Sequence, residues 1–215
     1  MSQNQPLETL QDIKRIMERS SRFISLSGLS GVSAGVFALI GTFVAGERIR
    51  EYYDHIQENR NSLTGNFNEL KLNLFVTAMA VMLAALVSAI YFTWRKARHD
   101  KLPVWDPSSR RMLINLFIPI VAGGLFIVGM LYHNEWHFVA PACLVFYGLG
   151  LVNASKYTYT DIRYVGLLEI MLGIISLFFP SYGLYFWAAG FGILHIVYGV
   201  IMWWKYERTT VAINS

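Results

Sequence analysis

Two ionisable residues, Glu169 and His195, stand alone in long apolar stretches of this sequence. Glu169 lies in YVGLLEIMLGIISLFF (164–179), and His195 lies in FGILHIVYG (191–199). An ionisable side chain at the centre of a membrane costs about 2.5–3.5 kcal/mol on insertion scales, so such residues are usually paired or functional. A carboxyl group beside an imidazole can bind and relay protons.

Small residues share a helical face with each of these groups: Gly166 and Gly173 with Glu169, and Gly192 and Gly199 with His195. Small residues let helix backbones approach closely in lipid. Because only residues 180–182 join the two stretches, we expect them to pack as antiparallel helices and to bring Glu169 against His195. The pair then either fastens two helices or forms a functional centre.

A second group of candidates is formed by His133 and His137 in HNEWH, which His55 could complete as a metal site. The zinc-binding pattern H-E-x-x-H places the glutamate next to the first histidine, on a helix. Here the glutamate is one position later, in a short connection, so a metal site is the less favoured interpretation. Because the nucleotide, hydrolase and redox motifs are missing, we expect neither enzymatic activity nor a cofactor.

Six apolar runs must position these residues. The chain is 54% hydrophobic and 15% charged, with a mean hydropathy of +0.40, whereas an average soluble domain has about 25% charged residues. Runs of this length are typical of membrane-spanning helices. They cover residues 23–45, 72–93, 112–132, 138–154, 162–179 and 183–204. The sequence therefore predicts an all-α, six-helix transmembrane bundle over 23–204, with the lipid bilayer as its main partner.

The distribution of positive charge predicts the orientation of this bundle. Of the 18 lysines and arginines, all but Arg48, Arg50, Arg60 and Lys71 fall on one side of the six runs. Because positively charged loops stay in the cytoplasm, we expect segment 1–22, the basic loop 94–111 and the tail 205–215 to be cytoplasmic. Residues 46–71 form the long outer loop. Topology thus explains the net charge of +4 without a nucleic-acid partner.

The ends of the first helix carry further signals. Residues 6–22 have the spacing of a short amphipathic helix, which either lies on the membrane surface or docks a soluble partner. Ser27, Gly31 and Gly35 recur every four residues, which indicates close helix packing, within the chain rather than across a homo-oligomer interface. Elsewhere, Asp106 followed by Pro107 predicts a helix start. Pro119 leaves the carbonyl of Asn115 without its helical donor.

Two segments, RSSRFISLSGLSGVSAGVFALIG (19–41) and GFGILHIVYGVIMWWKYER (190–208), carry a resemblance. They resemble a family of six-span bacterial membrane proteins of Bacteroidetes type whose activity is uncharacterised. The resemblance implies a multi-pass protein of the bacterial inner membrane. It also implies a sensory or regulatory role, because genes of this family often neighbour a small winged-helix regulator.

Three functions remain open at this point. The first is a small membrane sensor or regulatory subunit, with Glu169 and His195 as its polar core and the N-terminal helix contacting a cytoplasmic regulatory partner. The second is a proton-linked carrier of a small solute that uses the same pair. The third is a metal-dependent intramembrane enzyme at His133, His137 and His55. A polar path from Glu169 to a surface favours the carrier, and a sealed pair favours the sensor.

Overall fold

The computed structural model describes residues 22–58 and 67–208, so the predicted amphipathic helix over 6–22 lies almost wholly outside the described residues. Within them the chain is all-α. Five single helices come first: α2 (Gly28–Glu58), α3 (Phe67–His99), α4 (Pro107–Tyr132), α5 (Val139–Ala154) and α6 (Asp161–Leu177). A sixth, compound helix then joins α7 (Gly183–Trp187), η4 (Ala188–Leu194), α8 (His195–Met202) and η5 (Trp203–Glu207). Short helical turns η1 (Trp136–Phe138), η2 (Ser155–Tyr157) and η3 (Pro180–Tyr182) lie in the connections.

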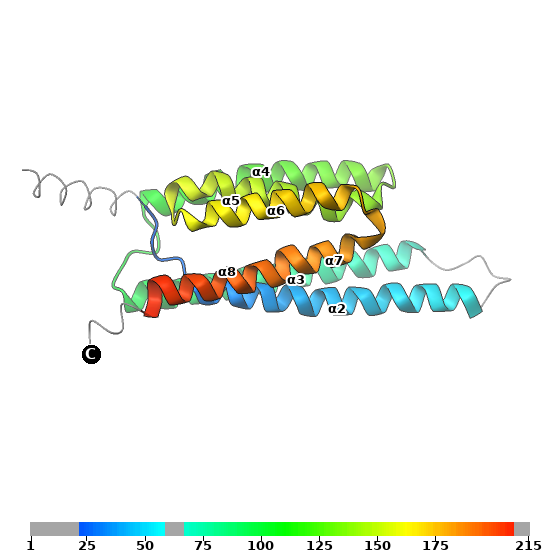
Figure 1. The fold of residues 1–215 in the computed structure, drawn as a ribbon, viewed down its shortest axis with the longest axis horizontal. Helices are drawn as coiled ribbons and strands as arrows, with labels where there is room; N and C mark the ends of the chain where they lie inside the picture. Colours follow the sequence, from blue (N-terminus) through cyan, green and yellow to red (C-terminus); the bar gives the residue numbers. More distant parts are fainter. Residues whose placement is uncertain (1–21, 59–66, 209–215) are drawn as a thin grey trace, which may run out of the picture.

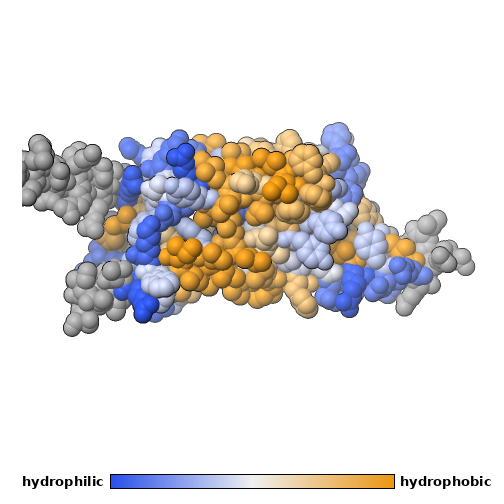
Figure 2. Space-filling view, in the orientation of Figure 1, coloured by the Kyte–Doolittle hydropathy of each residue, from blue (hydrophilic) through white to orange (hydrophobic). Residues whose placement is uncertain are grey.

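Five of these helices are long and apolar enough to cross a membrane, and α6, with 17 residues, is shorter. The surface agrees with this assignment. Figure 2 shows an apolar band around the middle of the molecule, with hydrophilic residues gathered at both ends. We call the end that carries Gly28, Pro107, Asp161 and Glu207 the inner end, and the opposite end the outer end. The prediction of an all-α bundle of six helices is confirmed, and five of the helices are candidates for crossing a membrane.

The helices form two layers, and this arrangement differs from the predicted one. In Figure 1, α4, α5 and α6 make one layer, while α2, α3 and the sixth helix make the other. We expected the fifth and sixth apolar runs to pack along each other, but α6 packs along α5, and α8 packs along α2. The sixth helix contacts α6 mainly through α7 and η4, near the short turn that joins them. The backbones of the two runs therefore approach each other in their outer halves and diverge toward the inner end, where the long side chains of Lys205 and Tyr206 still reach Asp161.

Glycine contacts explain this choice of neighbours. A Cβ atom added to Gly166 of α6 would lie 2.7 Å from the carbonyl oxygen of Gly148 in α5. A Cβ added to Gly35 of α2 would lie 2.6 Å from the carbonyl oxygen of Gly192 in the sixth helix. Such distances leave no room for a side chain. The small-residue faces of α6 and of the sixth helix are thus used against different helices.

Further glycines follow the same division between the layers. Gly31 of α2 lies against Gly199, with 3.2 Å between an added Cβ and the Gly199 Cα atom, and Gly173 of α6 lies against Pro141 and Val145 of α5. Ser27 takes a different role from the predicted one, since it precedes α2. Its hydroxyl group donates a hydrogen bond to Glu207 over 3.3 Å.

The start and the middle of α4 follow from sequence signals. Asp106 accepts a hydrogen bond from the Ser109 backbone, Ser109 bonds back to Asp106, and Pro107 is the first helical residue. The predicted helix start is therefore confirmed. The Asn115 carbonyl, which Pro119 deprives of its helical donor, accepts a hydrogen bond of 2.9 Å from the Asn153 side chain of α5. This bond joins α4 to α5 within the apolar layer.

The first helix begins later than its apolar run, and helices extend into the ends of both predicted loops. Residues 23–27 are not helical. The backbone of Phe23, Ile24 and Leu26 bonds to the α5–α6 connection and to Lys96, while the Ser27 carbonyl accepts from the first turn of α2. In the predicted outer loop 46–71, α2 continues to Glu58 and α3 already begins at Phe67, so helix covers most of it. In the predicted basic loop 94–111, α3 runs to His99 and α4 begins at Pro107. The continuation of these helices beyond the apolar runs shortens both connections.

Candidate functional site

Glu169 lies where the two layers meet. Its side chain projects from α6 and is 0% exposed. Neither carboxyl oxygen has a hydrogen-bond partner among the described residues. An ionised carboxylate buried without donors loses several kcal/mol of hydration with little in return. The enclosed carboxyl group is therefore suited to holding a proton.

His195 lies beside Glu169, at the first residue of α8. Its Nδ1 atom is 3.4 Å from Oε1 of Glu169 and 3.0 Å from the carbonyl oxygen of Gly190. Its Nε2 atom is 2.8 Å from the hydroxyl group of Tyr147 on α5. One neutral tautomer satisfies the two shorter contacts, with Nδ1–H donating to Gly190 and Nε2 accepting from Tyr147.

The expected Glu169–His195 pair is thus part of a larger cluster, which we define as Glu169, His195, Tyr147 and the Gly190 carbonyl. The sequence places Tyr147 in a helix without indicating that it meets His195, 48 positions later. Three segments contribute to the cluster: α5, α6 and the sixth helix. In it the Nδ1–H group lies between two acceptors, the Gly190 carbonyl and the Glu169 carboxyl group.

The sixth helix is irregular at this cluster. Residues 188–194 form a π-helix, η4, instead of the expected α-helix. Short π-helical segments are rare and often occur at functional sites. A Cβ atom added to Gly190 would lie 2.5 Å from both Oε2 of Glu169 and Cδ2 of Leu144. Only glycine at this position allows the backbone to approach the carboxyl group so closely, and the hydrophobic pattern does not indicate this contact.

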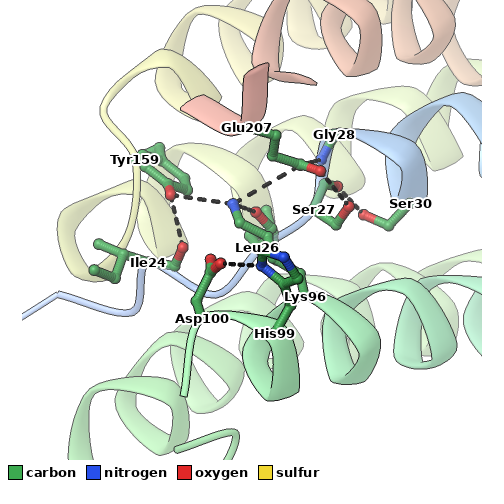
Figure 3. A network of polar contacts seen from close by, with 10 residues as sticks. All are labelled: Ile24, Leu26, Ser27, Gly28, Ser30, Lys96, His99, Asp100, Tyr159 and Glu207. Atoms are coloured by element: carbon green, nitrogen blue, oxygen red, sulfur yellow. Dashed lines mark hydrogen bonds and ion pairs between the residues drawn. The ribbon is translucent and has the colours of Figure 1, made fainter. Parts of the chain in front are cut away.

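A second polar network lies at the inner end, where residues 22–28 form a strap between the layers (Figure 3). The backbone of the strap is bonded to the α5–α6 connection. Phe23 N–H donates to Tyr157, Thr158 donates to the Phe23 carbonyl, and Tyr159 donates to the Ile24 carbonyl over 2.6 Å. Burial raises the pKa of the Tyr159 phenol above its ordinary value, so this donor keeps its proton at neutral pH.

Lys96 and Glu207 complete the strap from the other layer. The Lys96 ammonium group donates to the Leu26 carbonyl over 2.7 Å and lies 3.8 Å from Glu207. The Glu207 carboxylate accepts hydrogen bonds from the Gly28 N–H, over 2.5 Å, and from Ser27. Glu207 therefore caps the first turn of α2, where backbone N–H groups lack helical partners. The last residue of the sixth helix thereby holds the first turn of α2.

Glu207→Ala is expected to lower the free energy of unfolding by about 1.5–3 kcal/mol, the usual range for hydrogen bonds to a charged group. Glu51→Ala is the matched control, because among the described residues Glu51 makes only an exposed ion pair with Arg48 and should change stability by less than about 1 kcal/mol. Thermal melts in detergent measure both. Equal melting temperatures for the two variants would contradict the capping role.

The three histidines considered for a metal site are all among the described residues. Within the described part of the chain, no group of three His, Cys, Asp or Glu side chains is close enough to hold a metal ion. The structure therefore does not bring His55, His133 and His137 together. The His133 ring instead makes an edge-to-face contact with the Tyr132 ring, with ring centroids 5.3 Å apart.

Comparisons with protein-family models, with curated proteins and with solved structures gave no match to this chain. The Glu169 cluster and the polar network at the strap therefore provide the evidence for its function.

Proposed function

We propose that this chain is a small membrane sensor or regulatory subunit, and that it responds to the protonation of Glu169. The observation that carries the proposal is the Glu169 carboxyl group, 0% exposed and without a hydrogen-bond donor. Such a group binds a proton in the enclosed state. It takes a negative charge only if its surroundings change.

The enclosure of the cluster favours a sensor over a carrier. A proton-linked carrier needs space for its solute next to the proton site. Here Gly190 lies directly against both the carboxyl group and the Leu144 side chain, and His195 is only 8% exposed. A proton fits among these groups, and the packing leaves no such space for a solute.

His195 provides the response to a change at Glu169. When Glu169 loses its proton, the carboxylate becomes the stronger acceptor for the Nδ1–H group and competes with the Gly190 carbonyl. Loss of the bond to Gly190 removes one support of the π-helical turn in η4. Conversion of that turn to α-helix would rotate α8 and η5 against α2. Because Glu207 of η5 caps α2, the movement would reach the strap and segment 1–21.

The location and orientation belong to the same proposal. We place the protein in the bacterial inner membrane as a multi-pass protein, with the inner end and both termini in the cytoplasm. The uneven distribution of lysine and arginine supports this orientation. The N-terminal segment would then contact a cytoplasmic regulatory partner.

Cysteine labelling tests the orientation. In a Cys143→Ala background, Val104→Cys at the inner end should be protected from an impermeant thiol reagent in intact cells, and Glu135→Cys at the outer end should react. Both positions are exposed on the protein, so access depends on the membrane alone. Labelling at Val104 with protection at Glu135 would reverse the assigned orientation.

Hydrogen exchange tests the proposed function. Exchange in peptides covering the strap should change between mildly acidic and mildly alkaline pH, beyond the intrinsic change measured on an unfolded reference peptide. Glu169→Gln, which keeps volume and polarity but does not ionise, should abolish that change. An identical pH response in Glu169→Gln would overturn the proposal. Steady proton flux into vesicles loaded with a pH indicator, lost in the same variant, would favour the carrier.

A further inference from the structure

Tyr198 is a second buried polar group without a partner. Its hydroxyl oxygen is buried and has no hydrogen-bond partner among the described residues. Tyr198 is three residues inward of His195 on α8, about 4.5 Å along the helix. Residues three apart lie on the same face of an α-helix, so Tyr198 and His195 share a face of α8. Tyr198 thus lies on the inward side of the cluster.

The inner end is open to water and rich in proton-exchanging groups. Asp161 accepts hydrogen bonds from Lys205 over 2.7 Å and from Tyr206 over 2.8 Å. The side chains of Lys205 and Asp161 are 53% and 27% exposed. Tyr159 lies against Tyr206, with ring centroids 4.2 Å apart.

The outer side of the cluster is different, because apolar side chains close it. Leu144 and Pro141 of α5 are fully buried. The Trp187 and Phe191 rings of the sixth helix lie 4.7 Å apart, and Phe191 also packs against Tyr147. Two buried polar groups on this side lack a partner among the described residues: the Trp136 indole nitrogen in η1 and the Ser176 hydroxyl group on α6. Ser176 is seven residues from Glu169, about 10 Å along the helix.

We infer that protons reach Glu169 from the inner end only, and that the Tyr198 hydroxyl group is the relay. The inference rests on the proposed function and adds the side of the membrane from which the proton reaches Glu169. In the relay, the Tyr198 oxygen accepts a proton from the Asp161 side and releases its own proton toward Tyr147 and His195, so the tyrosine is unchanged. The titratable groups along this path are Tyr147 from α5, Tyr159 from the α5–α6 connection, Asp161 and Glu169 from α6, His195 from α8, and Lys205 and Tyr206 from η5. A site that opens to one side reports the proton concentration on that side and does not transport protons across the membrane.

The test follows the protonation of Glu169 after a step in pH. The protein is reconstituted in vesicles with either the inner or the outer end facing the bath. The infrared band of the carboxylic acid that Glu169→Gln removes is recorded against time. With the inner end facing the bath, Tyr198→Phe should slow the appearance of the band by about tenfold or more, as expected when one proton-transfer group is lost. The final amplitude of the band should be unchanged. Ser176→Ala, which removes the unpartnered hydroxyl group on the other side, should leave the rate as in the wild type.

The outcomes separate the two proposals. A wild-type response that is faster from the outer end, or an unchanged rate in Tyr198→Phe, would overturn the inner route and leave the sensor proposal standing. Slowing by Ser176→Ala alone would place the route on the outer side. A spectrum without any pH-dependent band that Glu169→Gln removes would overturn both proposals.

Discussion

Gly35→Ile is expected to lower the free energy of unfolding in detergent by about 1–3 kcal/mol or more, the range for overpacking a tight contact. A Cβ atom at this position would already lie 2.6 Å from both the Gly192 carbonyl oxygen and the Ile196 side chain. A branched side chain must therefore separate α2 from the sixth helix. Since α8 packs along α2, the change should also loosen the strap.

Gly124 of α4 provides the control for this prediction. Nothing outside its own helical turn lies within 4 Å of a Cβ atom added there, so the added side chain begins in open space among the described residues. Gly124→Ile should change stability little, and Gly124→Ala should raise it by up to about 1 kcal/mol through helix propensity. Melting temperatures of Gly35→Ile and Gly124→Ile that agree within error would remove the claim of backbone contact.

The second large effect is expected at Glu169. Glu169→Gln keeps the volume and a polar group and should cost little stability. Glu169→Leu should cost more, because it places an apolar side chain against His195 and removes one acceptor of the Nδ1–H group. Adding His195→Leu should recover part of this loss, since both polar groups are then absent. The coupling energy should be compared with those that double-mutant cycles give for hydrogen bonds in membrane proteins, which average about 0.6 and reach about 1.7 kcal/mol.

The structure also predicts which of two coupling energies of His195 is the larger. His195 keeps hydrogen bonds to Gly190 and Tyr147 when Glu169 is lost, and its distance to Tyr147, 2.8 Å, is shorter than its 3.4 Å to Glu169. The coupling between His195→Leu and Tyr147→Phe should therefore exceed that between His195→Leu and Glu169→Leu. A zero coupling energy for both pairs would contradict the cluster.

The apolar runs predict helices well because a chain in lipid must satisfy its backbone hydrogen bonds within each helix. They do not predict which helices become neighbours. Gly166 and Gly192 both signal close packing, but a glycine does not specify its partner. The contacts of Gly166 with α5 and of Gly192 with α2 depend on the whole arrangement. For the same reason, the inner halves of the two runs that carry Glu169 and His195 separate into different layers.

Two other features lie beyond the sequence pattern. The π-helical turn at Gly190 leaves the hydrophobic spacing almost unchanged, so periodicity does not distinguish it from an α-helix. The apolar pattern places the strap in the first helix, because residues 23–27 continue its apolar run. Its backbone bonds to Tyr157, Thr158, Tyr159 and Lys96, and only tertiary structure provides these partners.

The most direct test of the sensor is an equilibrium infrared titration of Glu169. Difference spectra of the wild type and of Glu169→Gln are recorded over the pH range in which both remain folded. In the wild type, a carboxylic acid band should grow reversibly as the pH falls, and this band should be missing in Glu169→Gln. Hydrogen exchange in the strap should change over the same pH interval. Identical difference spectra for the two proteins, or a wild-type Glu169 band that stays constant at every pH, would contradict it.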